Sequence, residues 1–408
     1  MGLLNTEPEE ERNTELKSYP IVYKGSVKNI RMAKEPKTRS PGRYVFEFTD
    51  DYSVFDYGKM PDRIRGKGCA IAMMSAYLFE ALADPSAWKA LFRKTGVWDR
   101  TGGKKGRARL KRSAVTKRLM AQGLPTHYLG LLDARGRCIR FSQLREPTNK
   151  ILVKAVPVVL PKQVPIDGKV VWDYSVFHPG LPQFLIPLEN VFRFGVPRGS
   201  SLLERLRKDP GYGQEIGLEA PPREGEWLPR PVLEFFSKLE PMDRYLRLEE
   251  ALNFSGLTGR EVQELSDLSL LIAVFLFNLV LEKGLDLWDG KFEFIKTNND
   301  LLLADSITPD ELRITFRGAQ LSKEPLRQYY KSQDGPFHRA MEEIKEEGSS
   351  SVRREVKARL GRGPRKLDPD FRRIAEQMYL SLAHRLTESP LFADAMELDA
   401  VVNSLNAN

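Results

Sequence analysis

The most informative stretch of the chain reads Asp289-Gly290-Lys291-Phe292-Glu293-Phe294, and a second run, Asp305-Ser306-Ile307-Thr308-Pro309-Asp310, follows shortly after it. In both runs apolar residues alternate with charged ones, which is typical of half-buried β-strands. The segment 296–300 between them is polar and favours a hairpin turn. We therefore expect a β-hairpin that brings Asp289, Glu293 and Asp305 into one neighbourhood.

Three carboxylates in one neighbourhood repel one another unless a cation shares the site. Hard divalent cations prefer oxygen ligands, so a Mg²⁺ ion that is bound to a nucleotide is the natural candidate. A plain surface hairpin with solvated acids explains the same pattern. The residues alone leave both interpretations open.

Both runs resemble the nucleotide- and metal-binding hairpin of the SAICAR synthetase family, the phosphoribosylaminoimidazole-succinocarboxamide synthases of purine biosynthesis. The family patterns are roughly D-x-K-x-E-F and D-E-x-x-P-D-x-x-R. The chain matches them with Asp289, Lys291, Glu293 and Phe294, and then with Asp305, Pro309, Asp310 and Arg313. Ser306 departs from the pattern, because the family usually carries a second acid at this place.

Other segments resemble family motifs in the same order along the chain. They are residues 22–30, 49–56, 66–68, 123–128, 186–193, 199–200 and 237–240. Each motif is short and unspecific by itself. The ordered set, which reaches from about residue 22 to residue 327, is highly specific for the family.

The resemblance implies an α+β, SAICAR synthetase-like two-lobed fold, with an N-terminal antiparallel-sheet lobe and a larger α/β lobe with C-terminal helices. We expect a flexible tail at residues 1–20 and an N-terminal nucleotide-binding lobe at 21–159, which contains a basic insert at 100–118. A central α+β lobe with the metal/ATP hairpin follows at 160–322, and a C-terminal helical region at 323–408. Helical spacing of apolar residues predicts helices near 69–82, 262–283 and 370–386.

The resemblance also implies an ATP- and Mg²⁺-dependent carbon–nitrogen ligase. The family joins the carboxylate of 5-amino-1-(5-phosphoribosyl)imidazole-4-carboxylate, hereafter the carboxylated ribonucleotide, to the amine of L-aspartate and so makes SAICAR in de novo purine biosynthesis. ATP first phosphorylates the carboxylate, and the amine then displaces phosphate from the acyl phosphate. Both steps depend mainly on positioning and charge neutralisation.

Residue roles follow from the resemblance, motif by motif. Catalytic roles fall to Asp289, Lys291 and Arg313. The nucleotide cofactor is bound by Gly25, Ser26, Lys28, Glu293 and Asp305, and the last two also hold Mg²⁺. The other substrates are bound by Arg193, Ser200, Lys238, Asp243 and Lys67.

Two departures from the family pattern affect these assignments. The family usually has a lysine at the position of Ser26, and a serine supplies no charge to a phosphate, although Lys24 or Lys28 can compensate. The segment between Arg193 and Ser200 is one residue longer than usual. The alignment therefore does not decide between Ser200 and Ser201.

Composition excludes several classes of protein. Two cysteines in 408 residues argue against a disulfide scaffold, and four scattered histidines against a zinc site. The net charge is +9, and the basic residues concentrate at 100–118 and 353–373. In neither segment are aromatic residues interleaved in the way that stacking platforms for nucleic acid need. We expect small-molecule partners, namely ATP, the carboxylated ribonucleotide and L-aspartate, and no nucleic acid.

The apolar run 268–281 is too short to cross a bilayer and predicts a buried core helix. We expect a cytoplasmic protein with no membrane partner, and a homo-oligomer is left open. Two alternative functions also stay open because Ser26 and Ser306 replace charged residues. One is the same chemistry on another azole carboxylate in nucleoside natural-product biosynthesis, and the other is a non-catalytic nucleotide-binding homologue.

Overall fold

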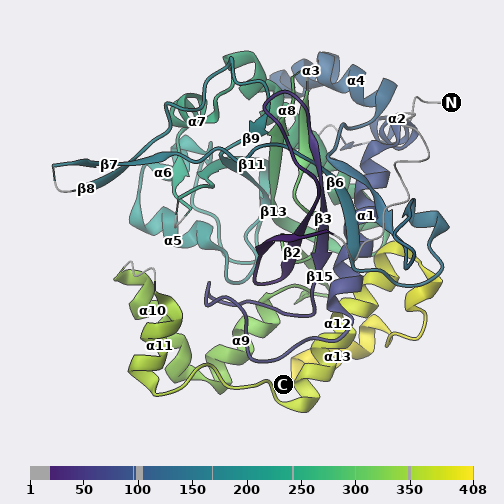
Figure 1. The fold of residues 1–408 in the computed structure, drawn as a ribbon, viewed down its shortest axis with the longest axis vertical. Coiled ribbons are helices and arrows are strands. Elements are labelled where there is room, and N and C mark those ends of the chain that lie inside the picture. The colour runs from purple at the N-terminus through teal and green to yellow at the C-terminus, as the bar shows by residue number, and fades with distance from the viewer. Residues whose placement is uncertain are drawn as a thin grey trace.

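The computed structural model describes residues 19–94, 96–97, 104–167, 169–240, 243–298, 300–347 and 351–407. Most of the predicted tail, the first residues of the basic insert (100–103) and Asn299 of the hairpin turn lie outside the described residues. The described elements form two large antiparallel sheets and a separate two-stranded one, with helices around them (Figure 1).

The first sheet has the strand order β1-β2-β3-β6-β4-β5, and all neighbours are antiparallel. Its strands are β1 (Ile21–Lys24), β2 (Lys28–Lys34), β3 (Gly42–Phe48), β4 (Tyr128–Leu132), β5 (Cys138–Ile139) and β6 (Lys150–Ala155). Helix α1 (Lys67–Ala83) packs on β3, β4 and β6. A helix that was predicted from apolar spacing near 69–82 is thus confirmed, and it buries one face of this sheet.

The second sheet has the order β12-β11-β10-β13-β15-β16, again with antiparallel neighbours. Its strands are β10 (Leu188–Gly195), β11 (Trp227–Ser237), β12 (Tyr245–Leu246), β13 (Asp286–Lys296), β15 (Leu312–Phe316) and β16 (Ala319–Gln320). The end of β13 leaves this path and pairs with β14 (Leu301–Ala304) and β9 (Phe184–Leu185). The predicted hairpin and its polar turn are confirmed as β13–β14, but its second strand is 301–304, and the run 305–310, which was predicted to be strand-like, follows β14 as a loop.

Helix α8 (Gly259–Glu282) lies under β10, β11 and β13. Thr258 and Glu261 form a capping box at its start, which satisfies backbone N–H groups of the first turn. Among the described residues, α8 alone is long and apolar enough for a membrane span, yet 67% of its apolar window is buried inside the protein. The predicted core helix is confirmed, and its apolar residues join one core that continues between both sheets.

The remaining elements surround the two sheets. Helices α2 (Pro85–Arg93), α3 (Lys104–Arg112) and α4 (Ala114–Gln122) follow α1, and α5 (Ser201–Lys208), α6 (Tyr212–Glu215) and α7 (Leu248–Ser255) flank the second sheet. The hairpin β7 (Lys162–Ile166)–β8 (Lys169–Asp173) projects from the body (Figure 1). Two short 3₁₀ segments, Phe141–Gln143 and Pro390–Phe392, complete the loops.

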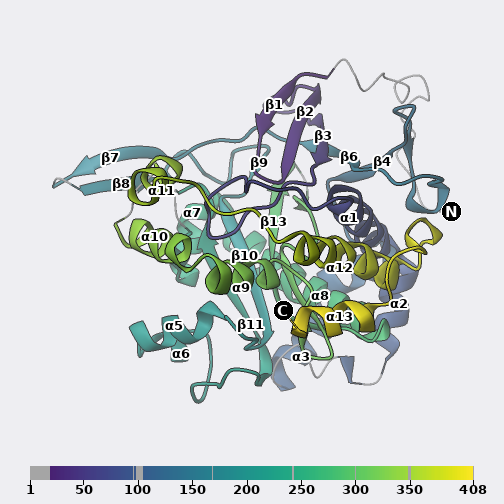
Figure 2. The same ribbon diagram turned by 90° about the horizontal axis from the view of Figure 1, so that it is seen from below.

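The C-terminal helices are α9 (Glu324–Gln333), α10 (Gly335–Glu346), α11 (Val352–Leu360), α12 (Pro369–Thr387) and α13 (Leu398–Ala407). Helix α12 packs along α1, and α13 packs on α12 (Figure 2). The C-terminal helices thus cover α1, the helix that packs on the first sheet. The α+β class, with an antiparallel sheet in each lobe, agrees with the prediction. The boundaries near residues 159 and 322 remain a prediction.

Candidate active site

Charged side chains gather on one face of the second sheet. Because strand residues alternate between faces, Arg193 on β10 and Asp289 on β13, which are direct cross-strand partners, share a face. They line a cleft of about 540 Å³. The charged residues around it are Asp56, Glu189, Arg193, Arg205, Asp243, Asp289, Lys291, Asp310, Glu311, Arg313, Lys323 and Arg327.

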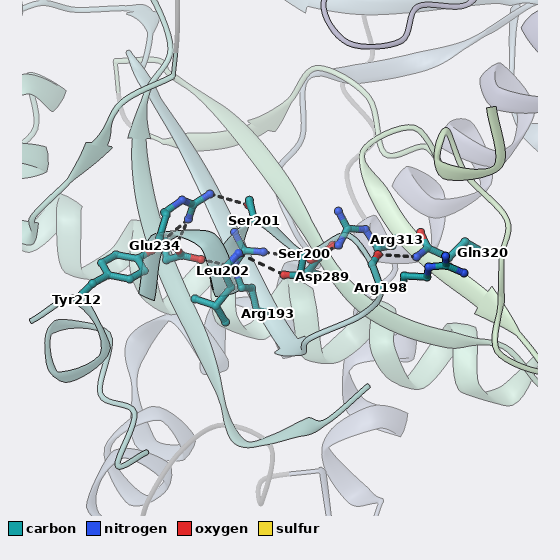
Figure 3. A network of polar contacts seen from close by, with 11 residues as sticks. Arg193, Arg198, Ser200, Ser201, Leu202, Tyr212, Glu234, Asp289, Arg313 and Gln320 are labelled. Carbon is teal, nitrogen blue, oxygen red and sulfur yellow. Dashed lines mark hydrogen bonds and ion pairs between the residues drawn. The ribbon is translucent and has the colours of Figure 1, made fainter. Parts of the chain in front are cut away.

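Asp289 lies between two arginines. The guanidinium groups of Arg193 and Arg313 each donate from Nη1 to Asp289 Oδ2, both at 3.2 Å (Figure 3). Only 5% of the Arg193 side chain is exposed. The two arginines come from the strands on either side of β13, so this triad depends on the pairing of β10, β13 and β15.

Glu234 on β11 forms the other end of the same network. Its carboxylate accepts from Arg193 Nε, from the Tyr212 hydroxyl and, at 2.6 Å, from Arg205 Nη1 (Figure 3). Burial and the neighbouring Glu234 carboxylate raise the pKa of Tyr212, so its hydroxyl keeps its proton and donates. Burial alone would lower the pKa of Arg193, but Glu234 and Asp289 raise it, so the guanidinium remains charged.

Lys291 and Lys238 flank the buried carboxylate of Glu189. Lys291 Nζ lies 2.8 Å from Glu189 Oε1 and 3.4 Å from Glu311 Oε2, and Lys238 Nζ lies 3.7 Å from Glu189 Oε1. Burial raises the pKa of the Glu189 carboxyl, and nearby Asp243 raises it further. The pKa of the Asp243 carboxyl is also raised, first by burial.

Glu293 and Asp305 form a second carboxylate pair at the β13–β14 hairpin. Burial and Asp305 raise the pKa of Glu293 to about 7. Burial also acts to raise the pKa of Asp305, but Lys28 and Lys238 bring it down to about 2. Lys28 pairs with Asp305 and Lys238 with Glu293, so two ammonium groups neutralise the pair.

The carboxylate pair fits a magnesium ion that arrives with a nucleotide. No group of three or more histidine, cysteine, aspartate or glutamate residues that could hold a metal occurs among the described residues. Mg²⁺ commonly binds through one or two carboxylates and completes its shell with water and substrate phosphates. The carboxylates of Glu293 on β13 and of Asp305 directly after β14 repel each other and match that requirement. They do not match a fully protein-ligated metal centre.

Asp305 is held in an uncommon backbone conformation, with φ of 59°. His127 Nε2 lies 2.8 Å from the backbone oxygen of Asp305, and burial lowers the pKa of His127 to about 4, so the ring is neutral at pH 7. The Ser75 hydroxyl accepts from the backbone N–H of Ile307 at 3.1 Å. Side chains of the first lobe thus fix the segment after β14, because non-glycine residues with positive φ need such support.

The turn between β1 and β2 carries the residues that were predicted to cover the nucleotide phosphates. Gly25 N–H donates to the Lys28 carbonyl at 2.9 Å, and a Cβ on Gly25 would lie 2.6 Å from that oxygen. The tight turn therefore requires glycine at this position. Ser26 lies half-buried in the turn, and Lys28 points to Asp305.

The structure gives different positions to Ser200 and Ser201, between which the alignment did not decide. Ser200 is buried, and its Oγ accepts from the Leu202 N–H at 3.4 Å as the N-cap of α5. Ser201 lines the cleft, and its Oγ accepts from Arg205 Nη2 at 2.8 Å. Ser201, rather than the predicted Ser200, therefore has its hydroxyl beside the arginine cluster of the cleft, which consists of Arg193, Arg205 and Arg313.

Lys67 has no exposed surface in the structure. Its Nζ lies 2.9 Å from Asp310 Oδ2, and Tyr379 donates to Asp310 Oδ1 at 2.7 Å. Burial acts to raise the pKa of Asp310, but Lys67, Lys323 and Tyr379 lower it to about 2. Lys67 was predicted to bind substrate; here it supports Asp310, which itself lines the cleft.

One expectation of the sequence needs correction. The hairpin brings Glu293 and Asp305 together, but Asp289 does not join them, because β14 pairs only with residues 293–296 of β13. Asp289 lies on the same face four residues earlier, about 13 Å along the strand. The predicted triple-carboxylate cluster is therefore two sites: a carboxylate pair, and an aspartate held by arginines.

Several residues of the site carried no recognisable signal in the sequence. Glu189 stands inside a family-like run, but a single acid on a strand predicts no role. Glu234 lies 41 residues from Arg193, and only the β10–β11 pairing brings them together. The others are Arg205, Tyr212, Glu311, Lys323 and Arg327.

Comparison with known proteins shows which family the chain resembles. The family model of SAICAR synthetase matches residues 21–121 and 182–344. A protein of Archaeoglobus fulgidus, provisionally named phosphoribosylaminoimidazole-succinocarboxamide synthase, is 33% identical over 386 residues, which cover 93% of this chain and 98% of that protein. The enzyme of this name from Thermoplasma acidophilum is 36% identical over 321 residues, covering 76% and 83%.

A solved structure, the SAICAR synthase of Saccharomyces cerevisiae complexed with SAICAR, has the same fold. Its TM-score is 0.53 at 20% identity, and the match covers 92% of this chain and 97% of that one. The chain thus has two lobes with a charged cleft between elements of both, and the family match extends over most of its length. The chain belongs to the SAICAR synthetase family.

Proposed function

We propose that the protein is an ATP- and Mg²⁺-dependent ligase that joins the carboxylated ribonucleotide to L-aspartate and releases SAICAR, ADP and phosphate. The observation that carries the proposal is the continuous charged face along β13, from Asp289 with its arginines, through Lys291, to Glu293 beside Asp305. The name of the Archaeoglobus fulgidus relative, which matches nearly the whole chain, supports the same reaction class.

In the proposed reaction, an oxygen of the azole carboxylate bonds to the γ-phosphorus of ATP, and ADP leaves. The amine of aspartate then forms the amide bond, and phosphate leaves with the electron pair of the broken C–O bond. An anionic carboxylate is a poor electrophile, and phosphorylation removes this obstacle. The protein must hold three anionic molecules close together. Cationic side chains are therefore needed to bind and neutralise them.

The described residues divide this work among themselves. Lys28 and the backbone of the Gly25 turn hold the nucleotide phosphates. Lys291, which is charged at neutral pH because Glu311 and Glu189 offset its burial, neutralises the reacting carboxylate. Arg193 and Arg313 bind the ribonucleotide, because a planar guanidinium pairs two oxygens at once.

Glu293 and Asp305 would hold the magnesium ion. When bound, Mg²⁺ neutralises phosphate charge during phosphoryl transfer. Lys28 and Lys238, which pair with these carboxylates in the structure, are then free to turn to anionic oxygens of the substrates.

Asp243 and Glu189 supply a proton acceptor for the aspartate amine. The two carboxyl groups lie close enough to interact, and burial raises the pKa of both, which makes the deprotonated form more basic than an exposed carboxylate. Asp243 also lines the cleft, so its oxygens can be reached by a substrate. In the proposal this pair takes the proton that the amine loses as the amide forms.

An ADP-release assay tests the proposal. Purified protein with ATP, Mg²⁺, the carboxylated ribonucleotide and aspartate should release ADP, and omission of aspartate or ribonucleotide should abolish sustained release. Release that requires a different azole carboxylate would favour the natural-product alternative. ATP binding without release under any substrate combination would favour a non-catalytic homologue.

A further inference from the structure

Glu234 is a fully enclosed carboxylate behind the arginines of the cleft. Only 1% of the residue is exposed, and its side chain has no exposed surface. Arg193 donates to Oε2, while Arg205 and Tyr212 donate to Oε1. The donors come from β10, α5 and α6, so one carboxylate ties together three elements of different parts of the chain.

Burying a carboxylate is costly, and two cations around it only partly repay the cost in stability. An apolar residue at this strand position would give the sheet a simpler core. Glu234 has no surface of its own in the cleft. We therefore expect it to act through its two arginine partners, Arg193 and Arg205, which both line the cleft.

The contacts of Arg193 leave little freedom to its guanidinium plane. Its Nε is held by Glu234 and its Nη1 by Asp289, at opposite edges of the group. Arg205 is fixed in the same way, by Glu234 on Nη1 and Ser201 on Nη2, and its guanidinium stacks 4.5 Å from the ring centroid of Phe236. Glu234 forms an ion pair with both arginines and so links them.

The charges of the cluster leave it able to bind an anion. Arg193, Arg205 and Arg313 contribute three positive charges, and Glu234 and Asp289 contribute two negative ones. One positive charge remains in excess. The cluster therefore suits an anionic phosphate or carboxylate group that takes several N–H donors in a fixed arrangement.

We propose that Glu234 is a positioning residue, which orients Arg193 and Arg205 so that both donate to one oxyanion of the ribonucleotide substrate. The inference rests on the proposed function, because that function supplies the ribonucleotide. The oxyanion is the ribose phosphate or the azole carboxylate, and Ser201 offers it a hydroxyl beside Arg205.

Glu234→Gln gives opposite results for two roles of this residue. If Glu234 only weakened the positive field, loss of its charge would tighten binding of an anion by simple Coulomb attraction. If it positions the arginines, binding weakens although the site becomes more positive. The glutamine has nearly the same shape, so packing is preserved in both cases.

Steady-state kinetics of the purified full-length protein provide the test. For Glu234→Gln we expect the KM for the ribonucleotide to rise about tenfold, the effect of weakened charged hydrogen bonds. The kcat and the KM values for ATP and aspartate should stay within about twofold, since uniform binding of one substrate is lost. Glu226→Gln, on the exposed loop before β11, is the matched control and should change none of these values.

Two further variants keep the test valid if Glu234→Gln unfolds. Tyr212→Phe removes one donor to Glu234 and leaves both arginines, so the same KM should rise about threefold. Glu234→Asp retains the charge and should restore part of the affinity that Glu234→Gln loses. Thermal unfolding is measured for each variant alongside the kinetics.

Two inhibitors identify the oxyanion. The ribonucleotide without its azole carboxylate keeps the phosphate, and the nucleoside without its phosphate keeps the carboxylate. Glu234→Gln should weaken competitive inhibition by only one of them, and that one carries the group that docks on the arginines. Equal inhibition of wild type and variant by both molecules would overturn the inference.

The inference would also be overturned if the wild type is active and the KM for the ribonucleotide is unchanged or lower in both Glu234→Gln and Tyr212→Phe. Absence of turnover in the wild type would instead contradict the proposed function. In that case, calorimetric binding of the ribonucleotide to wild type and Glu234→Gln still tests the positioning role separately.

Discussion

Lys28 forms an ion pair with Asp305, which lies 277 residues further along the chain. Lys28 begins β2 in the first sheet, and Asp305 follows β14 beside the second. The pair joins the glycine turn, which was predicted to cover the nucleotide phosphates, to a carboxylate that was predicted to hold magnesium. The lysine supplies the positive charge that two adjacent buried carboxylates require, so a bound cation would release it toward phosphate oxygens.

Asp305→Asn should lower kcat by about 100-fold and weaken the apparent affinity for Mg²⁺, because one of the two carboxylates for the ion is lost. Initial rates over a series of Mg²⁺ concentrations measure both effects. Asp300→Asn, in the exposed turn of the same hairpin, serves as control and should behave like wild type. An unchanged rate and Mg²⁺ dependence in Asp305→Asn would remove this residue from the metal site.

Ser26→Lys should tighten ATP binding about fivefold, since the new ammonium would lie in the glycine turn, two residues before Lys28. Calorimetric titration with ATP and Mg²⁺ gives the affinity. Ser40→Lys adds the same charge in the β2–β3 connection and separates a local effect from a general electrostatic one. Equal affinity in wild type and Ser26→Lys would mean that the turn does not face the phosphates.

Ser201→Ala should raise the KM for the ribonucleotide about fivefold, because it removes a hydroxyl at the arginine cluster. Ser200→Ala should leave that KM unchanged and instead lower stability by about 1 kcal/mol, through loss of the α5 cap. Kinetics and thermal unfolding of both variants distinguish the two roles. The reverse pattern would show that Ser200 is the serine that contacts substrate.

Lys67→Met should destabilise the protein at pH 7 by about 3 kcal/mol, because it leaves a buried Asp310 carboxylate without its ammonium partner. In wild type the pKa of Asp310 is lowered to about 2, so this carboxylate adds its full stability above its unfolded pKa of about 3.9 and loses it only as pH falls toward 2. In the variant the isolated carboxyl has a raised pKa and gains stability when it protonates.

The difference in stability between wild type and Lys67→Met should therefore shrink as pH falls from 7 to 4. Thermal unfolding at several pH values measures it. Asp310→Asn in the Lys67→Met background removes the unpaired charge and should flatten this pH dependence. A constant difference across the range would contradict the assigned pairing.

Local patterns in the sequence predict those parts of the fold that local physics determines. Alternating apolar and charged residues identified β13, a polar run identified the turn after it, and a continuous apolar run identified α8 as a core helix. The same alternation at 305–310 predicted a strand that the structure does not have. The order of short motifs gave the family. The signals for β13 and α8 lie within the residues of the structure that they predict, whereas the family signal comes from the whole ordered set of motifs.

The parts that could not be predicted depend on strand neighbours far apart in the chain. Glu234 contacts Arg193 because β11 pairs with β10. The sequence of neither strand predicts the register of this pairing. Asp289 was expected in one neighbourhood with Glu293 and Asp305, but Asp305 follows Ala304, the partner of Glu293, while Asp289 lies four residues earlier on β13. The burial of Lys67 depends on α12, whose Tyr379 shares Asp310 with it.

Mass-spectrometric detection of the product tests the central claim most directly. Purified protein is incubated with the carboxylated ribonucleotide, L-aspartate, ATP and Mg²⁺, and the mixture is analysed for SAICAR and ADP. We predict both products in equal amounts, with no SAICAR when aspartate is omitted. Absence of SAICAR from a folded preparation that binds ATP would contradict the proposed function.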